Sequence, residues 1–101
     1  MAKKSKIVAN EKRKAMVVRY QQRRDALRTA SKDATSSIEE RRSAMQALAK
    51  LPRDSSATRV RNRDQVDGRP RGFVGKASLS RIRFREAANR GELPGITKSS
   101  W

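Results

Sequence analysis

Residues 53–78 read RDSSATRVRNRDQVDGRPRGFVGKAS, and this stretch decides the fold because it interrupts an otherwise helical pattern. It contains three glycines, one proline and six arginines, and its apolar residues keep neither the alternation of a strand nor the period of a helix. We therefore predict an irregular, arginine-rich loop with a short strand at Phe73 and Val74. A loop of this length is uncommon in a compact domain unless it is functional or disordered.

The residues before the loop predict two helices. Good helix formers without Gly or Pro fill residues 3–28, but their apolar side chains fall on opposite sides of the helix. Ser37 and Glu40 have the spacing of a capping box, so a second helix is expected to begin there and to stop before Pro52. The first helix is either solvated or a basic arm that touches RNA on one side and protein on the other. The second has one apolar stripe, expected to pack on the first helix or on a neighbouring protein, made of Ile38, Ala44, Met45, Leu48, Ala49 and Leu51.

After the loop, apolar spacing predicts a third, short helix. Either Ser78 or Ser80 can cap its start, and Gly91 is suited to end it. Its apolar positions are Leu79, Ile82, Phe84, Ala87 and Ala88. The predicted class is therefore a mainly α, extended and non-globular chain, with two N-terminal helices, an arginine-rich loop and a short C-terminal helix.

The composition indicates a chain that folds on a polyanion. The 101 residues include 26 Lys and Arg but only 10 Asp and Glu, which gives a formal charge of +16 and a pI near 11.6. Leu, Ile, Val and Phe number only 17 in total, fewer than the roughly 20 % below which a highly charged chain cannot bury enough apolar surface. Nucleic acid is the expected partner, and we expect no homo-oligomer.

Several classes of function are disfavoured. The chain has neither Cys nor His, so disulfides, thiolate metal sites and the usual acid–base catalysts are missing, and we expect no enzyme and no cofactor. Nothing in the sequence resembles a signal peptide or a membrane span, and the basic first helix lacks the apolar face of a membrane-active helix. A cytoplasmic protein without a membrane partner is expected.

The arginines of the loop are the strongest candidates for binding nucleic acid. Positions 59, 61 and 63 alternate, which in an extended chain would point three guanidinium groups to one side, toward successive phosphates. A disordered basic linker is the alternative. Trp101 is expected either to stack on a base or to pack on its own helix. The predicted binding residues are Arg53, Arg59, Arg61, Arg63, Arg69, Arg71, Lys76, Arg81, Arg85, Arg90, Lys98 and Trp101.

Four motifs together resemble a known family. LPRDSSATRVRNR at 51–63, GRPRGF at 68–73, LSRIRFREAANRGELPG at 79–95 and KSSW at 98–101 are similar to the C-terminal half of the S14 family of small-subunit ribosomal proteins. The start, MAKKSKIVANEKRK, is similar to the long bacterial form. The resemblance implies a helical N-terminal arm at 1–52 and a segment at 53–101 that binds ribosomal RNA and keeps the remnant of a zinc ribbon.

The resemblance also implies what this chain has lost. Zinc-binding members carry two C-x-x-C pairs separated by twelve residues, and those positions fall here on Asp64, Asp67, Ser80 and Arg83. The chain therefore resembles the zinc-independent type, in which polar contacts and RNA hold the loop. We hypothesise that the two aspartates form ion pairs with nearby arginines, such as Arg61, Arg63, Arg69 and Arg83, in place of metal bonds.

The remaining expectations concern place and partners. The resemblance implies binding of ribosomal RNA in the head of the small subunit, help in assembling the 3′ major domain, and a position near the A site. It implies small-subunit proteins three, ten and nineteen as neighbours, and possible replacement of a zinc-binding paralogue when zinc is scarce. The rival class is a DNA-coating protein, which would share the charge but would need no fixed loop between its helices.

Overall fold

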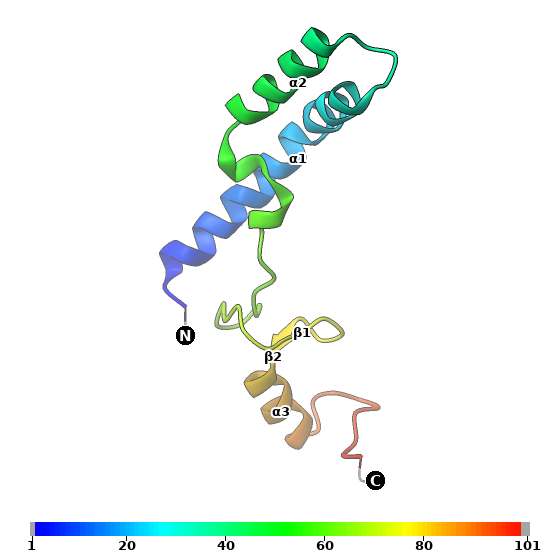
Figure 1. The fold of residues 1–101 in the computed structure, drawn as a ribbon. Coiled ribbons are helices and arrows are strands. Elements are labelled where there is room, and N and C mark those ends of the chain that lie inside the picture. Colours follow the sequence, from blue (N-terminus) through cyan, green and yellow to red (C-terminus); the bar gives the residue numbers. More distant parts are fainter. Residues whose placement is uncertain (1, 100–101) are drawn as a thin grey trace. The chain divides into compact units, whose positions relative to one another are not determined.

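The computed structural model describes residues 2–99 and divides them into two compact units. The helical unit comprises residues 9–60, and the C-terminal unit comprises residues 2–8 together with 61–99. The elements, in chain order, are α1 (Lys4–Lys32), α2 (Ile38–Lys50), the 3-10 helices η1 (Arg53–Ser55) and η2 (Ala57–Arg59), β1 (Phe73–Val74), β2 (Leu79–Ser80) and α3 (Arg81–Asn89) (Figure 1). The predicted mainly α class with little sheet is confirmed.

The caps of α2 lie where the sequence predicts them. The Ser37 hydroxyl accepts the Glu40 N–H at 3.2 Å, and the Glu40 carboxylate accepts the Ser37 N–H at 3.3 Å, so the capping box is complete. The helix ends at Lys50, with extended backbone at Leu51 before Pro52. By contrast, α1 continues through Lys32, beyond the predicted end at residue 28.

Polar contacts hold η1 against α1 within the helical unit. The Arg13 Nε donates to the Asp54 carboxylate at 3.3 Å, and the Arg24 Nε donates to the Ser55 hydroxyl at 2.9 Å. Arg59 adds a second ion pair to Asp54, at 2.7 Å. These contacts require the chain after α1 to run back along that helix, so α2 and α1 form a hairpin.

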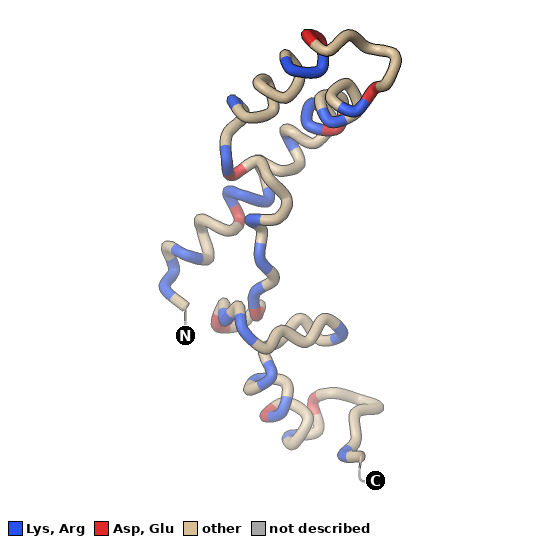
Figure 2. The backbone as a smooth tube through the Cα atoms, in the orientation of Figure 1, with Lys and Arg blue, Asp and Glu red and all other residues tan. Residues whose placement is uncertain are grey.

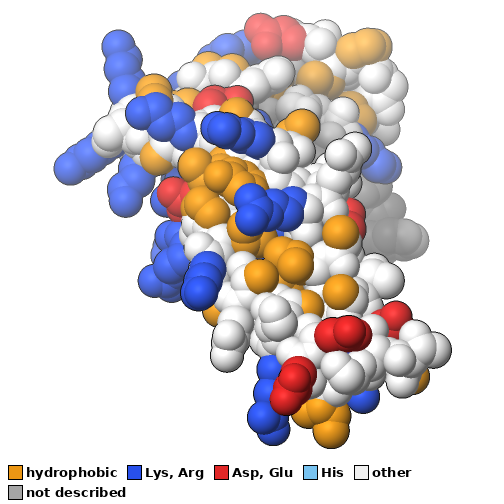
Figure 3. All heavy atoms as spheres, turned by 90° about the horizontal axis from the view of Figure 1, so that it is seen from above, with side chains coloured by type: hydrophobic (Ala, Val, Ile, Leu, Met, Phe, Trp, Pro, Cys, Tyr) orange, Lys and Arg blue, Asp and Glu red, His pale blue; other side chains and the backbone are white. Residues whose placement is uncertain are grey.

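The apolar stripe of α2 is only partly covered. Ala44 and Leu51 are buried, whereas Ile38 and Met45 leave 63 % and 58 % of their surface exposed. Val18 of α1 is also exposed, at 72 %. Figure 3 shows exposed hydrophobic side chains among basic ones on the face it draws. The stripe is thus buried at Ala44 and Leu51 and exposed at Ile38 and Met45, and its packing on α1 or on a neighbouring protein remains a prediction.

The C-terminal unit contains a two-stranded hairpin followed by α3. β1 and β2 are antiparallel, with Phe73 opposite Ser80 and Val74 opposite Leu79. The Ser80 hydroxyl caps α3 by accepting the Arg83 N–H at 3.4 Å. At the other end, Gly91 adopts φ +76°, and the N–H groups of Gly91 and Glu92 bond to the carbonyls of Ala88 and Ala87, which is a Schellman motif.

Three features differ from the sequence-based prediction. Leu79, expected in the third helix, lies in β2, because Ser80 caps the helix only at Arg81. The loop expected to be irregular begins with η1 and η2, which follow from consecutive backbone hydrogen bonds after Pro52. Arg59 is therefore in a 3-10 turn, so an extended alternation does not begin there.

Buried apolar side chains are few throughout residues 2–99. They are Ala44, Leu51, Leu79 and Ala87, and an equal number of polar residues is buried: Asn10, Ser55, Asp64 and Ser80. The small core expected from composition is thus observed. Hydrogen-bonded polar side chains fill part of the interior beside the apolar ones. None of the described helices is long and apolar enough to span a membrane. The chain passes from the helical unit to the C-terminal unit between Val60 and Arg61. The division into a helical arm at 1–52 and an RNA-binding segment at 53–101 remains a prediction.

Candidate nucleic-acid interface

The carboxylate of Asp64 organises the turn at residues 64–68. Its Oδ1 accepts the Val66 N–H at 2.7 Å, and its Oδ2 accepts the Ser80 N–H at 2.6 Å. Asp64 is 3 % exposed and Ser80 is fully buried. The Asp64 carboxylate therefore links the turn to Ser80, the N-cap residue of α3, which lies sixteen positions further along the chain.

Backbone hydrogen bonds close the same turn. The Gly68 N–H bonds to the Asp64 carbonyl at 2.9 Å, and the Asp64 N–H bonds to the Arg69 carbonyl at 3.0 Å. Gly68 adopts φ +75°, a conformation in which a side chain would be strained. Gly68 therefore allows a sharp turn here, and Gly72, with φ +64°, does so before β1.

The electrostatics of Asp64 favour its charged form. Burial acts to raise the pKa of the Asp64 carboxyl group, but hydrogen bonds donated by Ser80, Val66 and Asp67 outweigh burial and lower the pKa below its ordinary value. Because the carboxylate stays ionised, it stabilises the turn at neutral pH.

A carbon-detected NMR titration checks this assignment. We expect the Asp64 carboxyl group to titrate below about 3.9, the value typical of an unfolded chain. Since the folded-state pKa is depressed, the stabilisation is present above about pH 4 and is lost as the pH falls through the folded-state pKa. A titration at or above the unfolded value would show that the carboxylate does not accept these hydrogen bonds.

The four positions that align with zinc ligands lie together. Asp67 Oδ2 lies 3.6 Å from the Arg83 Nε, and Asp67 Oδ1 accepts the Arg69 N–H at 3.0 Å. Asp64 is bonded to Ser80, and Ser80 caps the helix at Arg83. The predicted ion pair with a nearby arginine is present for Asp67, while Asp64 accepts hydrogen bonds from backbone N–H groups instead. We call this set, Asp64, Asp67, Ser80 and Arg83, the polar lock.

The polar lock is unsuited to a metal ion. The guanidinium of Arg83 supplies a positive charge beside Asp67, where a cation would have to sit. Among residues 2–99, no group of three or more acidic, Cys or His side chains is placed to hold a metal. The lock therefore satisfies its two carboxylates with protein donors.

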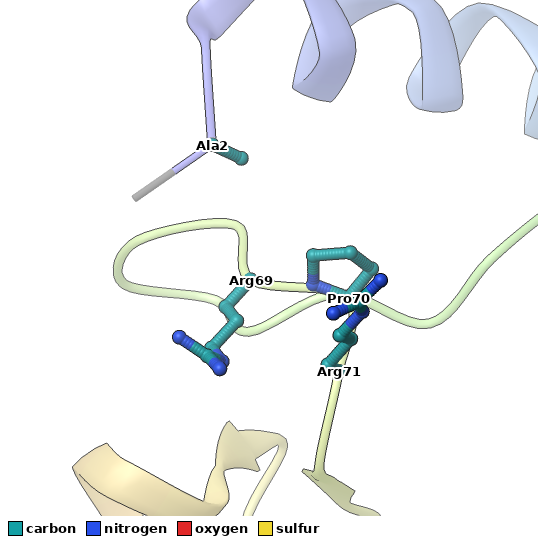
Figure 4. A pocket seen from close by; sticks show the side chains of 4 residues that line it. All are labelled: Ala2, Arg69, Pro70 and Arg71. Carbon is teal, nitrogen blue, oxygen red and sulfur yellow. The ribbon is translucent and has the colours of Figure 1, made fainter.

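Arginines flank the turn that the lock holds. Arg63 donates from Nη1 to the Gly68 carbonyl at 2.9 Å and is half-buried. Arg69, Pro70 and Arg71 line a hollow of about 260 Å³ together with Ala2 (Figure 4). The structure thus brings three of the predicted binding residues to one turn.

Other predicted residues lie on the hairpin, α3 and the tail. The Arg81 side chain lies against Gly72, where an added Cβ would stand 2.9 Å from its Cγ and Cδ. Arg85 and Lys98 line a second hollow with Phe84 and Ile96. Lys76 is exposed in the turn between β1 and β2, and Arg90 forms an ion pair with Glu92 at 4.0 Å.

The predicted residues still to be placed are Arg53, Arg59, Arg61 and Trp101. Arg53 and Arg59 belong to the helical unit, and Arg61 is exposed at the start of the C-terminal unit. Trp101 lies outside the described residues. Figure 2 shows Lys and Arg distributed along both units, with Asp and Glu interspersed.

Sequence reasoning missed one set of basic residues. Lys3, Lys4 and Lys6 were assigned to the helical arm, but the structure places residues 2–8 in the C-terminal unit. The only signal in the sequence is the basic run KKSK, which does not indicate its spatial neighbour. Contacts across sixty residues are not encoded in local periodicity.

Comparison with known proteins identifies the family. Residues 47–100 match the family described as ribosomal protein S14p/S29e. Small ribosomal subunit protein uS14 of Cutibacterium acnes is 64 % identical over 101 residues, and this covers all of both chains. Small ribosomal subunit proteins uS14A of Mycolicibacterium smegmatis and uS14 of Leifsonia xyli are each 59 % identical, again over both full lengths.

The chain belongs to the ribosomal protein S14 family. The resemblance stated from the sequence motifs is therefore confirmed, as is a structural rather than enzymatic role. Because this S14 protein has no cysteine, it is of the zinc-independent type. The polar lock is the local structure that accompanies the missing ligands.

Proposed function

We propose that this S14 protein is a constituent of the small ribosomal subunit in the cytoplasm and that its C-terminal unit binds ribosomal RNA. The observation that carries the proposal is its full-length similarity to small ribosomal subunit proteins, 64 % for the first relative named above. The basic side chains around the polar lock support it, because phosphate contacts dominate affinity for nucleic acid.

The finer proposal concerns place and neighbours. We infer that the protein binds RNA in the head of the subunit, assists assembly of the 3′ major domain and helps to shape the region near the A site. The exposed apolar residues of the helical unit, Val18, Ile38 and Met45, support contact with protein as well as RNA. Small-subunit proteins three, ten and nineteen are the proposed partners.

Sedimentation tests the proposal against the DNA-coating alternative. The tagged full-length protein, expressed in its own host, is followed through a sucrose gradient after a high-salt wash. We expect it with small subunits at close to one copy each. Recovery with chromosomal DNA, or at the top of the gradient, would reject a ribosomal role.

We further propose that this copy can replace a zinc-binding paralogue when zinc is scarce. The polar lock supports the idea, since it holds the turn with protein donors alone. A genome search for a copy with C-x-x-C pairs, followed by transcript measurements during zinc depletion, tests it. Constant expression would count against replacement.

A further inference from the structure

The N-terminal segment is part of the C-terminal unit. The Ala2 N–H donates to the Asp67 carbonyl at 3.3 Å, and residues 2–8 cluster with residues 61–99 rather than with the rest of α1. This segment therefore contacts the turn that the polar lock holds. Its charge consists of three exposed lysines, Lys3, Lys4 and Lys6.

Ile7 of the segment lies beside Gly68 of the turn. A Cβ added to Gly68 would stand 2.6 Å from Cδ1 and Cγ1 of Ile7 and 3.4 Å from Cβ of Ala2. A Cβ atom cannot approach another carbon atom this closely. Because Gly68 has no side chain, the Ile7 side chain can occupy this space. Gly68 is itself buried. The packing depends on two residues, Ile7 and Gly68, that are 61 positions apart in the sequence.

The hollow between the segment and the turn has a composition suited to a nucleic-acid backbone. In Figure 4, the Pro70 ring faces Ala2, and the Arg69 side chain extends to the side of the loop away from Ala2. Apolar walls accommodate a ribose, while guanidinium groups pair with a phosphate. Arg69 is one of the residues that line this hollow, and its Nε has no hydrogen-bond partner among the described residues.

We propose that residues Ala2–Ile7 and the turn Asp64–Arg71 form one composite surface for RNA phosphates, with Ile7 on Gly68 as the contact that holds its two halves together. The proposal rests on RNA binding by the C-terminal unit and adds the N-terminal lysines to that site. Ile7 and Gly68 are positioning residues, and Lys3, Lys4, Lys6, Arg69 and Arg71 are the binding residues.

The charge of the segment is tested with an in-vitro transcript of the 3′ major domain of small-subunit ribosomal RNA. We expect the full-length Lys3/Lys4/Lys6→Gln variant to bind about 100-fold more weakly at 0.1 M salt. The slope of log K against log salt should fall by about two to three units. The control, Arg23/Lys32/Lys50→Gln, removes the same charge from exposed positions of the helical unit and should change the slope by less than about one unit.

The contact between the halves is tested with Ile7→Ala. This change leaves every charge in place, yet we expect binding to weaken by about 10-fold or more, because the lysines lose at least half of their contribution to log K. In the Ile7→Ala background the lysine triple should have less than half its effect on log K, because the segment is no longer held. Gly68→Ala should act like Ile7→Ala. Gly75→Ala, which meets nothing within 4 Å, and Gly95→Ala, which shares a positive φ but also meets nothing, should bind normally.

The outcomes separate the two proposals. If the unchanged protein binds the transcript no better than duplex DNA of equal length, the proposed function fails. If it prefers the transcript but the two triple variants lower the slope equally, or Ile7→Ala and the lysine triple act additively, the composite surface is wrong and RNA binding stands.

Discussion

Asp64→Ala is expected to open the C-terminal unit and to lower the occupancy of the protein on small ribosomal subunits. The change leaves the buried N–H group of Ser80 and the partly buried N–H group of Val66 without an acceptor. Each such loss costs about 1–3 kcal/mol, so we expect about 3 kcal/mol in total. Hydrogen exchange of the Ser80 amide in purified subunits should accelerate about 100-fold, and quantitative mass spectrometry should show reduced occupancy.

Asp67→Ala is the matched control for this variant. It removes the same charge from the same turn, but its hydrogen bond from the Arg69 N–H is only part-buried, and its ion pair is with Arg83, whose side chain is 37 % exposed. We therefore expect a loss on the order of 1 kcal/mol. Both variants make the protein more basic, so electrostatics alone would strengthen RNA binding. Normal exchange and occupancy in Asp64→Ala would refute the role assigned to the polar lock.

The affinity for the ribosomal RNA transcript is expected to fall about 10³- to 10⁵-fold between 50 and 200 mM salt. This range follows from release of counterions if roughly six to ten phosphates are contacted. The formal charge of +16 on 101 residues supplies enough cations for that number. Filter binding or fluorescence anisotropy across the salt series measures the slope.

Variants of single arginines show which side chains contact phosphate and so contribute to the slope of log K against log salt. Arg71→Gln, at the exposed margin of the hollow, should reduce the slope by about one unit. Arg28→Gln is the control, because Arg28 lies in the helical unit, 4.0 Å from Asp25, and is not among the predicted binding residues. An affinity that does not depend on salt would overturn the electrostatic account.

Local features of the sequence predicted the elements and their ends well. The capping box at Ser37 and Glu40, the stop before Pro52, the cap at Ser80 and the end at Gly91 all depend on neighbours within a few residues. Their physics is short-range, so one sequence suffices to predict them. β2 is not predicted because Leu79 also fits the apolar spacing of the third helix.

The sequence predicts only part of the site, because some of its contacts join residues that are far apart along the chain. The spacing of the family motif correctly indicates that Asp64, Asp67, Ser80 and Arg83 lie close together. No local feature of the sequence indicates whether Asp64 accepts hydrogen bonds from backbone N–H groups or forms an ion pair. The contact of Ile7 with Gly68 joins residues far apart in sequence. Binding of RNA by the predicted arginines and lysines remains a prediction.

Zinc chelation tests the central claim, that this S14 protein enters the small subunit with its turn held by the polar lock rather than by metal. Cells expressing it as their sole S14 protein are grown with and without a zinc chelator, and the occupancy of their small subunits is measured by quantitative mass spectrometry. We predict equal occupancy in both media. Occupancy that falls on chelation and returns with added zinc would contradict the account.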